Sequence, residues 1–167
     1  MFDRTIALKS VLLVMSLSVG ATALAQSAQR GCIELKTVAE VEETYVDANG
    51  NNATRLTPAA KVVPGDEVVW TIVANNVCTT PAGDVAITNP VPEHMRYVGN
   101  SAFGPGANIE FSLDGAAFAS ADALTVAEAD GSRRAARADE YSAIRWALPR
   151  PMGPSESLVV RYRAVVL

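Results

Sequence analysis

The sequence predicts an all-β fold, a two-sheet antiparallel β-sandwich, for three reasons. Apolar and polar side chains alternate with period two along most of the chain after residue 25. Clusters of Pro, Gly, Asn and Asp interrupt this alternation, as is typical of turns between strands. No stretch after residue 25 shows the apolar spacing of an amphipathic helix. Turn signals at this spacing favour two packed sheets over a barrel or an α/β fold.

Residues 1–25 are the exception, because they have the parts of a secretion signal. Arg4 and Lys9 precede a short apolar stretch, and small residues follow it up to Ala25. The apolar stretch is shorter than the roughly 20 residues that a membrane-spanning helix needs. We therefore expect a helical signal peptide that is cleaved after Ala25, and a single exported domain over residues 26–167.

The first half of this domain is expected to form three strands. Residues 33–41 place apolar side chains on one face and mostly charged ones on the other. Residues that tolerate positive φ at 47–52 predict a hairpin into a second strand over 53–63. A Pro-Gly turn at 64–67 leads to a central strand over 68–75, which is rich in β-branched and apolar residues.

The second half is expected to form five more strands, which cover residues 84–89, 95–98, 109–113, 144–148 and 158–166. Pro90 and Pro92 end the first of these, because proline cannot continue a hydrogen-bonded ladder. Asp114-Gly115 is a hairpin signal. Residues 119–140 are interpreted mostly as loop, in which Leu124 and Val126 are the only strand-like pair.

The inward positions of these strands predict the structural core, with the two tryptophans as its anchors. The expected core residues are Trp70, Ile72, Ile87, Phe111, Ile144, Trp146, Val160 and Tyr162.

The two cysteines, Cys32 and Cys78, both lie after the expected cleavage point. Thiols oxidise outside the cytoplasm, so we expect one disulfide between them. It would tie the start of the exported chain to the interior of the fold and contribute about 3 to 4 kcal/mol on the chain-entropy model. Two unpaired, partly buried thiols are the alternative. Lipid attachment at Cys32 is disfavoured by the polar residues Gln29 and Arg30.

The charge of the exported product bounds its partners. Without Asp3, Arg4 and Lys9 it carries 12 basic side chains against 17 acidic ones, a net charge of −5. We expect no nucleic-acid partner, since phosphates require a basic surface. No later apolar run is long enough to span a membrane. The expected location is therefore the periplasm or the cell exterior, including the cell surface.

Two motifs carry a family resemblance. Pro64-Gly65-Asp66 precedes a long strand that ends at Asn75, and Asn89-Pro90-Val91-Pro92 precedes the pair Tyr97-Val98. They resemble the conserved-repeat module known as domain of unknown function 11, in which a PGD turn and a D/N-P-x-P segment hold these places. Ile144-Arg145-Trp146 and Arg161-Tyr162-Arg163-Ala164 look like the C-terminal part of small single-module relatives in bacteria. The resemblance covers residues 33–167.

The resemblance implies an immunoglobulin-like two-sheet antiparallel β-sandwich on an exported or surface protein. Such modules usually serve as spacers or adhesive units. This chain differs from the tandem-repeat members in showing one copy of the module. The family carries no agreed catalytic residues, so none is transferred to this sequence.

Catalytic and metal-binding chemistry has few candidates. His94 is the only histidine, and an imidazole-based active site would have to use it. No nucleophile-elbow motif accompanies it. Cys32, Cys78 and His94 are too few for a zinc site that needs several such ligands. We expect no catalytic residue, no metal and no cofactor.

Three polar clusters have simpler explanations than a site. Asp47, Asn49 and Asn51 begin like a calcium loop, but the rest of such a loop is missing and a hairpin explains them. Glu40, Glu42 and Glu43 could supply a carboxylate pair, but they are interpreted as the solvated face of a strand. The basic cluster Arg133, Arg134 and Arg137 has acidic neighbours that offset it.

We therefore expect an exported, non-enzymatic structural or adhesive module of the bacterial cell envelope or exterior. Its expected partner is a protein or a cell surface, and a second copy of the chain is one candidate. Loops 90–95 and 119–140 would be free to bind. Two alternatives remain open. One is a self-assembling fibre subunit, joined by β-strand donation from an N-terminal segment such as 33–35. The other is a small periplasmic hydrolase that uses His94 or a carboxylate pair.

Overall fold

The computed structural model describes residues 31–167, so the expected signal peptide and its cleavage point lie outside the described residues. Residues 31–167 form one compact unit. This unit is all-β, with short 3-10 turns as its only helical elements. Within it, no helix has the length and apolar character to cross a membrane.

The larger sheet has five antiparallel strands in the order β2-β1-β3-β10-β5. Its members are β1 (Ile33–Val46), β2 (Asn52–Pro58), β3 (Glu67–Asn76), β5 (Met95–Tyr97) and β10 (Ser157–Val166). The expected central strand is therefore central, since β3 lies between β1 and β10.

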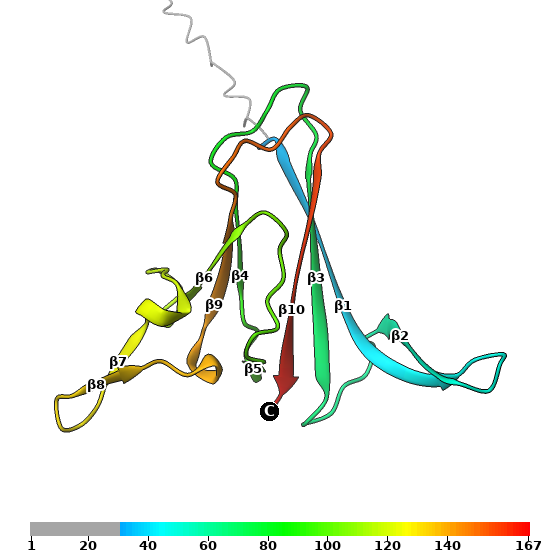
Figure 1. The fold of residues 1–167 in the computed structure, drawn as a ribbon, viewed down its shortest axis with the longest axis horizontal. Coiled ribbons are helices and arrows are strands. Elements are labelled where there is room, and N and C mark those ends of the chain that lie inside the picture. The colour runs from blue at the N-terminus through cyan, green and yellow to red at the C-terminus, as the bar shows by residue number, and fades with distance from the viewer. Residues whose placement is uncertain (1–30) are drawn as a thin grey trace, which may run out of the picture. The chain divides into compact units, whose positions relative to one another are not determined.

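A three-stranded antiparallel sheet faces the larger one (Figure 1), in the order β4-β9-β6. Its members are β4 (Ala86–Pro90), β6 (Asn108–Ser112) and β9 (Ala143–Ala147). A separate hairpin joins β7 (Thr125–Ala127) to β8 (Arg133–Ala135), flanked by the turns η1 (Ala121–Ala123) and η2 (Ala138–Glu140). In Figure 1 this hairpin and the far end of the β1–β2 hairpin extend away from the facing sheets on opposite sides.

Both sheets contribute side chains to one core. Seven of the expected core residues are buried, namely Ile72, Ile87, Phe111, Ile144, Trp146, Val160 and Tyr162. Trp70 packs against the core but is half-buried. It lies between Ala39 of β1 and Tyr162 of β10.

Tyr162 of β10 stands at the centre of this core. Its ring lies 6.2 Å from the ring of Trp146, which belongs to the facing sheet, and stacks at 6.3 Å on Trp70. Its hydroxyl accepts a hydrogen bond of 2.7 Å from the amide of Asn89 in β4. Burial raises the pKa of Tyr162, so the hydroxyl stays neutral and able to bond.

Two expected elements differ from the structure. The second strand ends at Pro58 and not at Val63; Val62 and Val63 are exposed in the connection to β3. The interpretation of residues 119–140 as loop is wrong for the β7–β8 hairpin. This hairpin turns at Gly131, which has a φ of +84°.

β1 has two different neighbours along its length. Residues 33–41 pair with β3, and residues 40–46 pair with β2. Since β2 ends opposite Glu40, the first part of β1 has a neighbouring strand on one side only.

We predict that Tyr162→Phe lowers the free energy of unfolding by about 1 kcal/mol, because it removes the buried hydroxyl that Asn89 bonds. Urea denaturation measures this change. Tyr45→Phe is the matched control, since Tyr45 is exposed on the β1–β2 hairpin and should change little. Equal effects of the two substitutions would contradict the role given to Tyr162.

Candidate functional site

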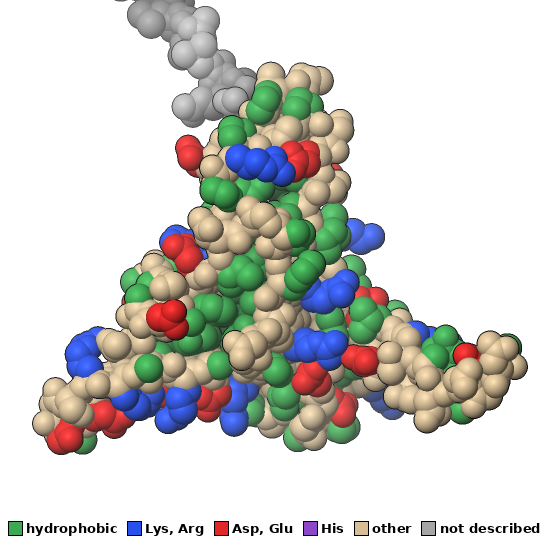
Figure 2. All heavy atoms as spheres, in the orientation of Figure 1, with side chains coloured by type: hydrophobic (Ala, Val, Ile, Leu, Met, Phe, Trp, Pro, Cys, Tyr) green, Lys and Arg blue, Asp and Glu red, His purple; other side chains and the backbone are tan. Residues whose placement is uncertain are grey.

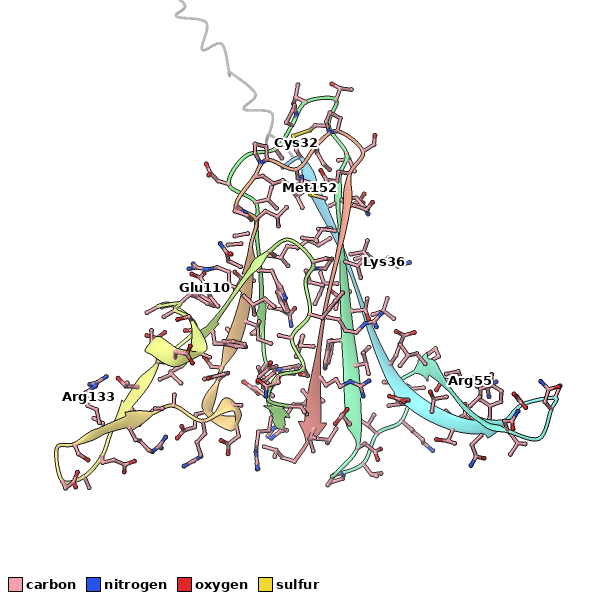
Figure 3. All side chains as sticks on the ribbon, in the orientation of Figure 1. Cys32, Lys36, Arg55, Glu110, Arg133 and Met152 are labelled. Atoms are coloured by element: carbon pink, nitrogen blue, oxygen red, sulfur yellow. A yellow bond between two sulfur atoms is a disulfide. The ribbon has the colours of Figure 1, made fainter. Side chains whose placement is uncertain are left out.

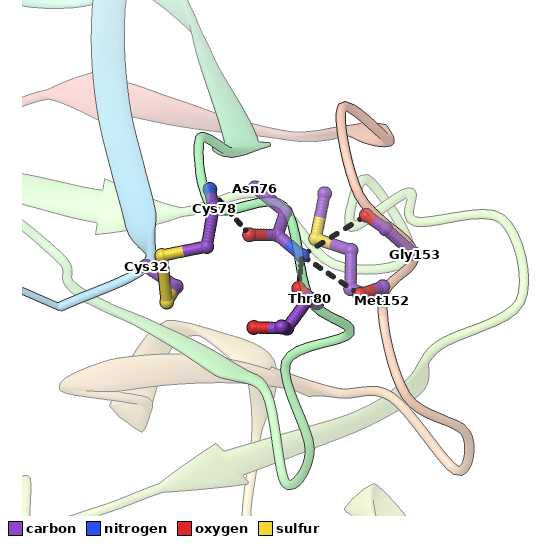
Figure 4. Close-up of a disulfide and its surroundings, with 6 residues drawn as sticks. All are labelled: Cys32, Asn76, Cys78, Thr80, Met152 and Gly153. Carbon is purple, nitrogen blue, oxygen red and sulfur yellow. Dashed lines mark hydrogen bonds between the residues drawn. A yellow bond between two sulfur atoms is a disulfide. The ribbon is translucent and has the colours of Figure 1, made fainter.

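One end of the unit is fixed by a disulfide. Cys32, immediately before β1, and Cys78, after β3, are joined, with their Cα atoms 5.2 Å apart (Figure 4). The bond ties the beginning of the described chain to the connection between β3 and β4. A disulfide of this kind fits an oxidising compartment.

Asn76 locks the loops beside the disulfide. Its side-chain amide donates to the carbonyl oxygens of Thr80, Met152 and Gly153, each at 3.0 Å (Figure 4). Its Oδ1 accepts the N–H of Cys78 at 3.0 Å. The residue is only 1% exposed, so these bonds are shielded from water. The loop after β3 and the loop before β10 are thereby held as one rigid end.

Sequence reasoning missed Asn76. The pair Asn75-Asn76 marks the end of a strand, but both residues carry the same side chain. Only the three-dimensional structure shows that Asn76 points inward and meets carbonyls from two loops, whereas Asn75 accepts a bond from Ser157 near the surface.

His94 lies in an exposed turn between β4 and β5, with a φ of +62°. Its carbonyl accepts the N–H of Leu167 at 2.8 Å, a bond that closes the end of the sheet. Among the described residues no nucleophile or carboxylate bonds its ring. The described geometry therefore places His94 in a turn, where its backbone closes the end of the sheet.

The acidic cluster of β1 does not form a carboxylate pair. Glu42 pairs with Arg163 at 3.0 Å, and Glu43 pairs with Arg55 at 2.9 Å. Arg163 also holds Glu67 at 2.6 Å. Glu42, Glu43, Glu67 and Arg163 line an open hollow of about 680 Å³ together with Lys61 and Asp66. Each of the three glutamates is already ion-paired with an arginine.

The Asp47 cluster forms a hairpin turn. Oδ1 of Asp47 accepts the N–H groups of Asn49 and Asn51 at 2.8 and 2.9 Å. These backbone bonds hold the pKa of Asp47 below its usual value. Gly50, with a φ of +81°, completes the reversal. The carboxylate thus serves the turn itself, and within residues 31–167 no three acidic, His or Cys side chains gather as metal ligands.

The basic cluster is a network of ion pairs that organises the β7–β8 hairpin. Arg134 bonds Glu140 through both guanidinium arms, at 2.7 and 2.5 Å, and also pairs with Glu128. Arg137 contributes its N–H to Glu140 at 2.7 Å. Figure 2 shows basic and acidic side chains next to each other along this hairpin. The cluster is therefore balanced in charge.

The first part of β1 forms an open edge. Val77 donates its N–H to the carbonyl of Cys32, and Ala59 donates to the carbonyl of Ala39. These two bonds fix the alternation: backbone groups of even-numbered residues point to β3, and those of odd-numbered residues point to the other side. No described strand lies there before Ala39. Within residues 31–167, the N–H and C=O groups of Ile33, Leu35 and Thr37 thus have no partner.

We name residues 33–37 the open strip of β1. Leu35 lies on the core-facing side of the strip, yet 52% of it is exposed. A hollow of about 350 Å³ separates Ile33 and Leu35 from Ala86 and Ile87 of β4. Unpaired backbone groups beside an exposed apolar side chain are the features of a surface that accepts another strand.

We predict that Asn76→Asp lowers the free energy of unfolding by about 3 kcal/mol or more, because a carboxylate cannot donate to the three carbonyls it would face. Asn75→Asp is the matched control: an acid oxygen can still accept the 2.6 Å bond from Ser157. Urea denaturation compares the variants at neutral pH. Similar stabilities for both would refute the locking role of Asn76.

We predict that acid loosens the β7–β8 hairpin. The bond from Arg134 and the N–H of Arg137 lower the pKa of Glu140 from 4.5 to about 2. A lowered pKa stabilises the folded hairpin above the unfolded value of 4.5, and this support is lost as pH falls toward about 2. The protection factors of the hairpin amides, which correct the NMR exchange rates for the intrinsic effect of pH, should fall in the wild type across this range.

Glu140→Gln provides the control for this titration, since an amide does not ionise. Its hairpin should exchange faster already at neutral pH and respond less to acid. Wild-type protection factors that do not change between pH 4.5 and 2 would contradict the assignment.

Comparison with known proteins identifies no family for this chain. No protein-family model, no curated protein and no solved structure matches this chain. The likeness to domain of unknown function 11 thus rests on the sequence motifs alone.

Proposed function

We propose that this chain is an immunoglobulin-like β-sandwich, exported by a cleavable signal peptide, that acts as a structural or adhesive module of the bacterial cell envelope or exterior. The observation that carries the proposal is the rigid end built by the Cys32–Cys78 disulfide and the buried Asn76. A disulfide fits export. Loops held in one arrangement suit a binding surface, because little conformational entropy is lost when a partner binds to them.

The arrangement of the two facing sheets supports the immunoglobulin-like part of the proposal. All strand pairs are antiparallel, and a tryptophan of one sheet packs on a tyrosine of the other, Trp146 on Tyr162. Such sheets pack through their inward side chains and leave their end loops outside the core.

The polar groups support a role without catalysis. Glu42 is ion-paired with Arg163, and Glu43 is ion-paired with Arg55. The backbone carbonyl of His94 accepts the N–H of Leu167. A hydrolase requires an acid, base or nucleophile within hydrogen-bond reach of its partner. The described contacts of these residues serve turns and ion pairs.

Strand donation by residues 33–35 is not favoured as a second function. These residues pair with Ala74, Asn75 and Asn76 of β3 in the same chain. Donating them would break that pairing and pull against the disulfide at Cys32.

Binding to isolated cell envelopes tests the adhesive role. We predict that fluorescently labelled protein, exported and purified, binds envelopes of the producing bacterium saturably and is displaced by unlabelled protein. Protein whose disulfide has been reduced and alkylated should compete poorly, because its rigid end is released. Non-saturable binding, or equal competition by the alkylated form, would overturn the proposal.

A further inference from the structure

We propose that two copies of this chain associate through the open strip of β1, running antiparallel about a two-fold axis at Leu35. The two larger sheets then join into one continuous sheet. This inference depends on the edge of β1 and not on the proposed function.

The backbone of the strip is complementary to itself. Ile33, Leu35 and Thr37 all direct their N–H and C=O groups away from β3. In an antiparallel pairing centred on Leu35, each Ile33 meets the second copy's Thr37 and each Leu35 meets its own equivalent. Every one of these pairs exchanges both N–H···O=C bonds, so no unpaired group of the strip is left over.

The charges of the strip fit the same register. Glu34 would lie directly opposite the second copy's Lys36, and the two-fold axis repeats the contact in the other direction. Glu34 and Lys36 are exposed and make no ion pair with any residue of 31–167. Figure 3 shows Lys36 pointing away from the three-stranded sheet. Opposite charges facing each other across paired strands are stabilising.

Leu35 supplies the apolar part of the contact. It is 52% exposed although it lies on the same side of the sheet as the core residue Ile72. In the proposed pair the two Leu35 side chains lie side by side next to the hollow below β4. Contact between them removes apolar surface of both copies from water.

Two other edge strands, β4 and β2, each end in a proline, which the strip of β1 lacks. Val85 beside β4 and Ala59 beside β2 are hydrogen-bonded to the neighbouring inner strands, so the odd-numbered residues of β4 and β2 point inward. The even-numbered residues, which include Pro90 of β4 and Pro58 of β2, therefore point to the open edge. Proline offers no N–H and is a common means of preventing strand addition. The strip of β1 contains no proline. The strip therefore lacks this obstacle to the addition of a second chain.

The symmetry of the pairing limits the assembly. Each copy uses the same strip, so the contact closes with two copies and does not continue into a filament. Five residues from each copy make a small interface, and we expect a reversible dimer that forms as concentration rises.

A charge exchange tests the register. Sedimentation velocity measures the dimer dissociation constant of the exported protein, purified after expression of the full chain. Glu34→Lys and Lys36→Glu each place like charges opposite each other twice, and each should raise the constant about tenfold. An equal mixture of the two variants should recover association, since the mixed pair restores every opposite-charge contact. The double variant should recover it alone.

Glu93→Lys is the control for net charge, because Glu93 lies in an exposed turn away from β1. It should leave the dissociation constant unchanged. A wild-type protein that stays monomeric at every soluble concentration would overturn the proposal. So would a dimer that is indifferent to both single changes, or single variants that fail to associate when mixed. Envelope binding is measured separately, so either proposal can fail without the other.

Discussion

The contact between Tyr162 and the facing sheet is the constraint on which the other features depend. Its ring brings β10 against Trp146, and its hydroxyl reaches Asn89 on β4, so one side chain joins the two sheets by packing and by a hydrogen bond. Trp70 extends the stack toward β1. A single buried core of this kind aligns the sheets, and their alignment decides which strands are covered and which are left at the margin.

The sheets differ in width, and this difference creates the candidate surface. Three strands cannot cover five, so β1 lies at the margin with Leu35 on a core-facing side that has little core above it. β2 covers only the second part of β1. At the nearby end, the disulfide and Asn76 fix the start of the same strand. A rigid end beside an open strand edge suits a module that functions by binding other molecules.

The sequence predicted most of the strands because their alternation is local. Val68 to Asn75 and Leu158 to Val166 carry apolar residues at every second position, and prolines and glycines mark the turns between strands. The β7–β8 hairpin was missed because the ion pairs of Arg134 with Glu128 and Glu140, which organise it, give no periodic signal. Residues 33–35 were raised from the sequence as a donor strand. That they form an open edge was not predicted, because it depends on where β2 ends.

Amide hydrogen exchange along β1 tests the central claim most directly. In dilute protein the account predicts alternation, with fast exchange at Ile33, Leu35 and Thr37 and slow exchange at Glu34, Lys36 and Val38, whose N–H groups point to β3. As concentration rises, exchange at the odd-numbered residues should slow selectively. Equal protection of odd and even residues in dilute protein would show that the edge of β1 is not open, and would contradict the account.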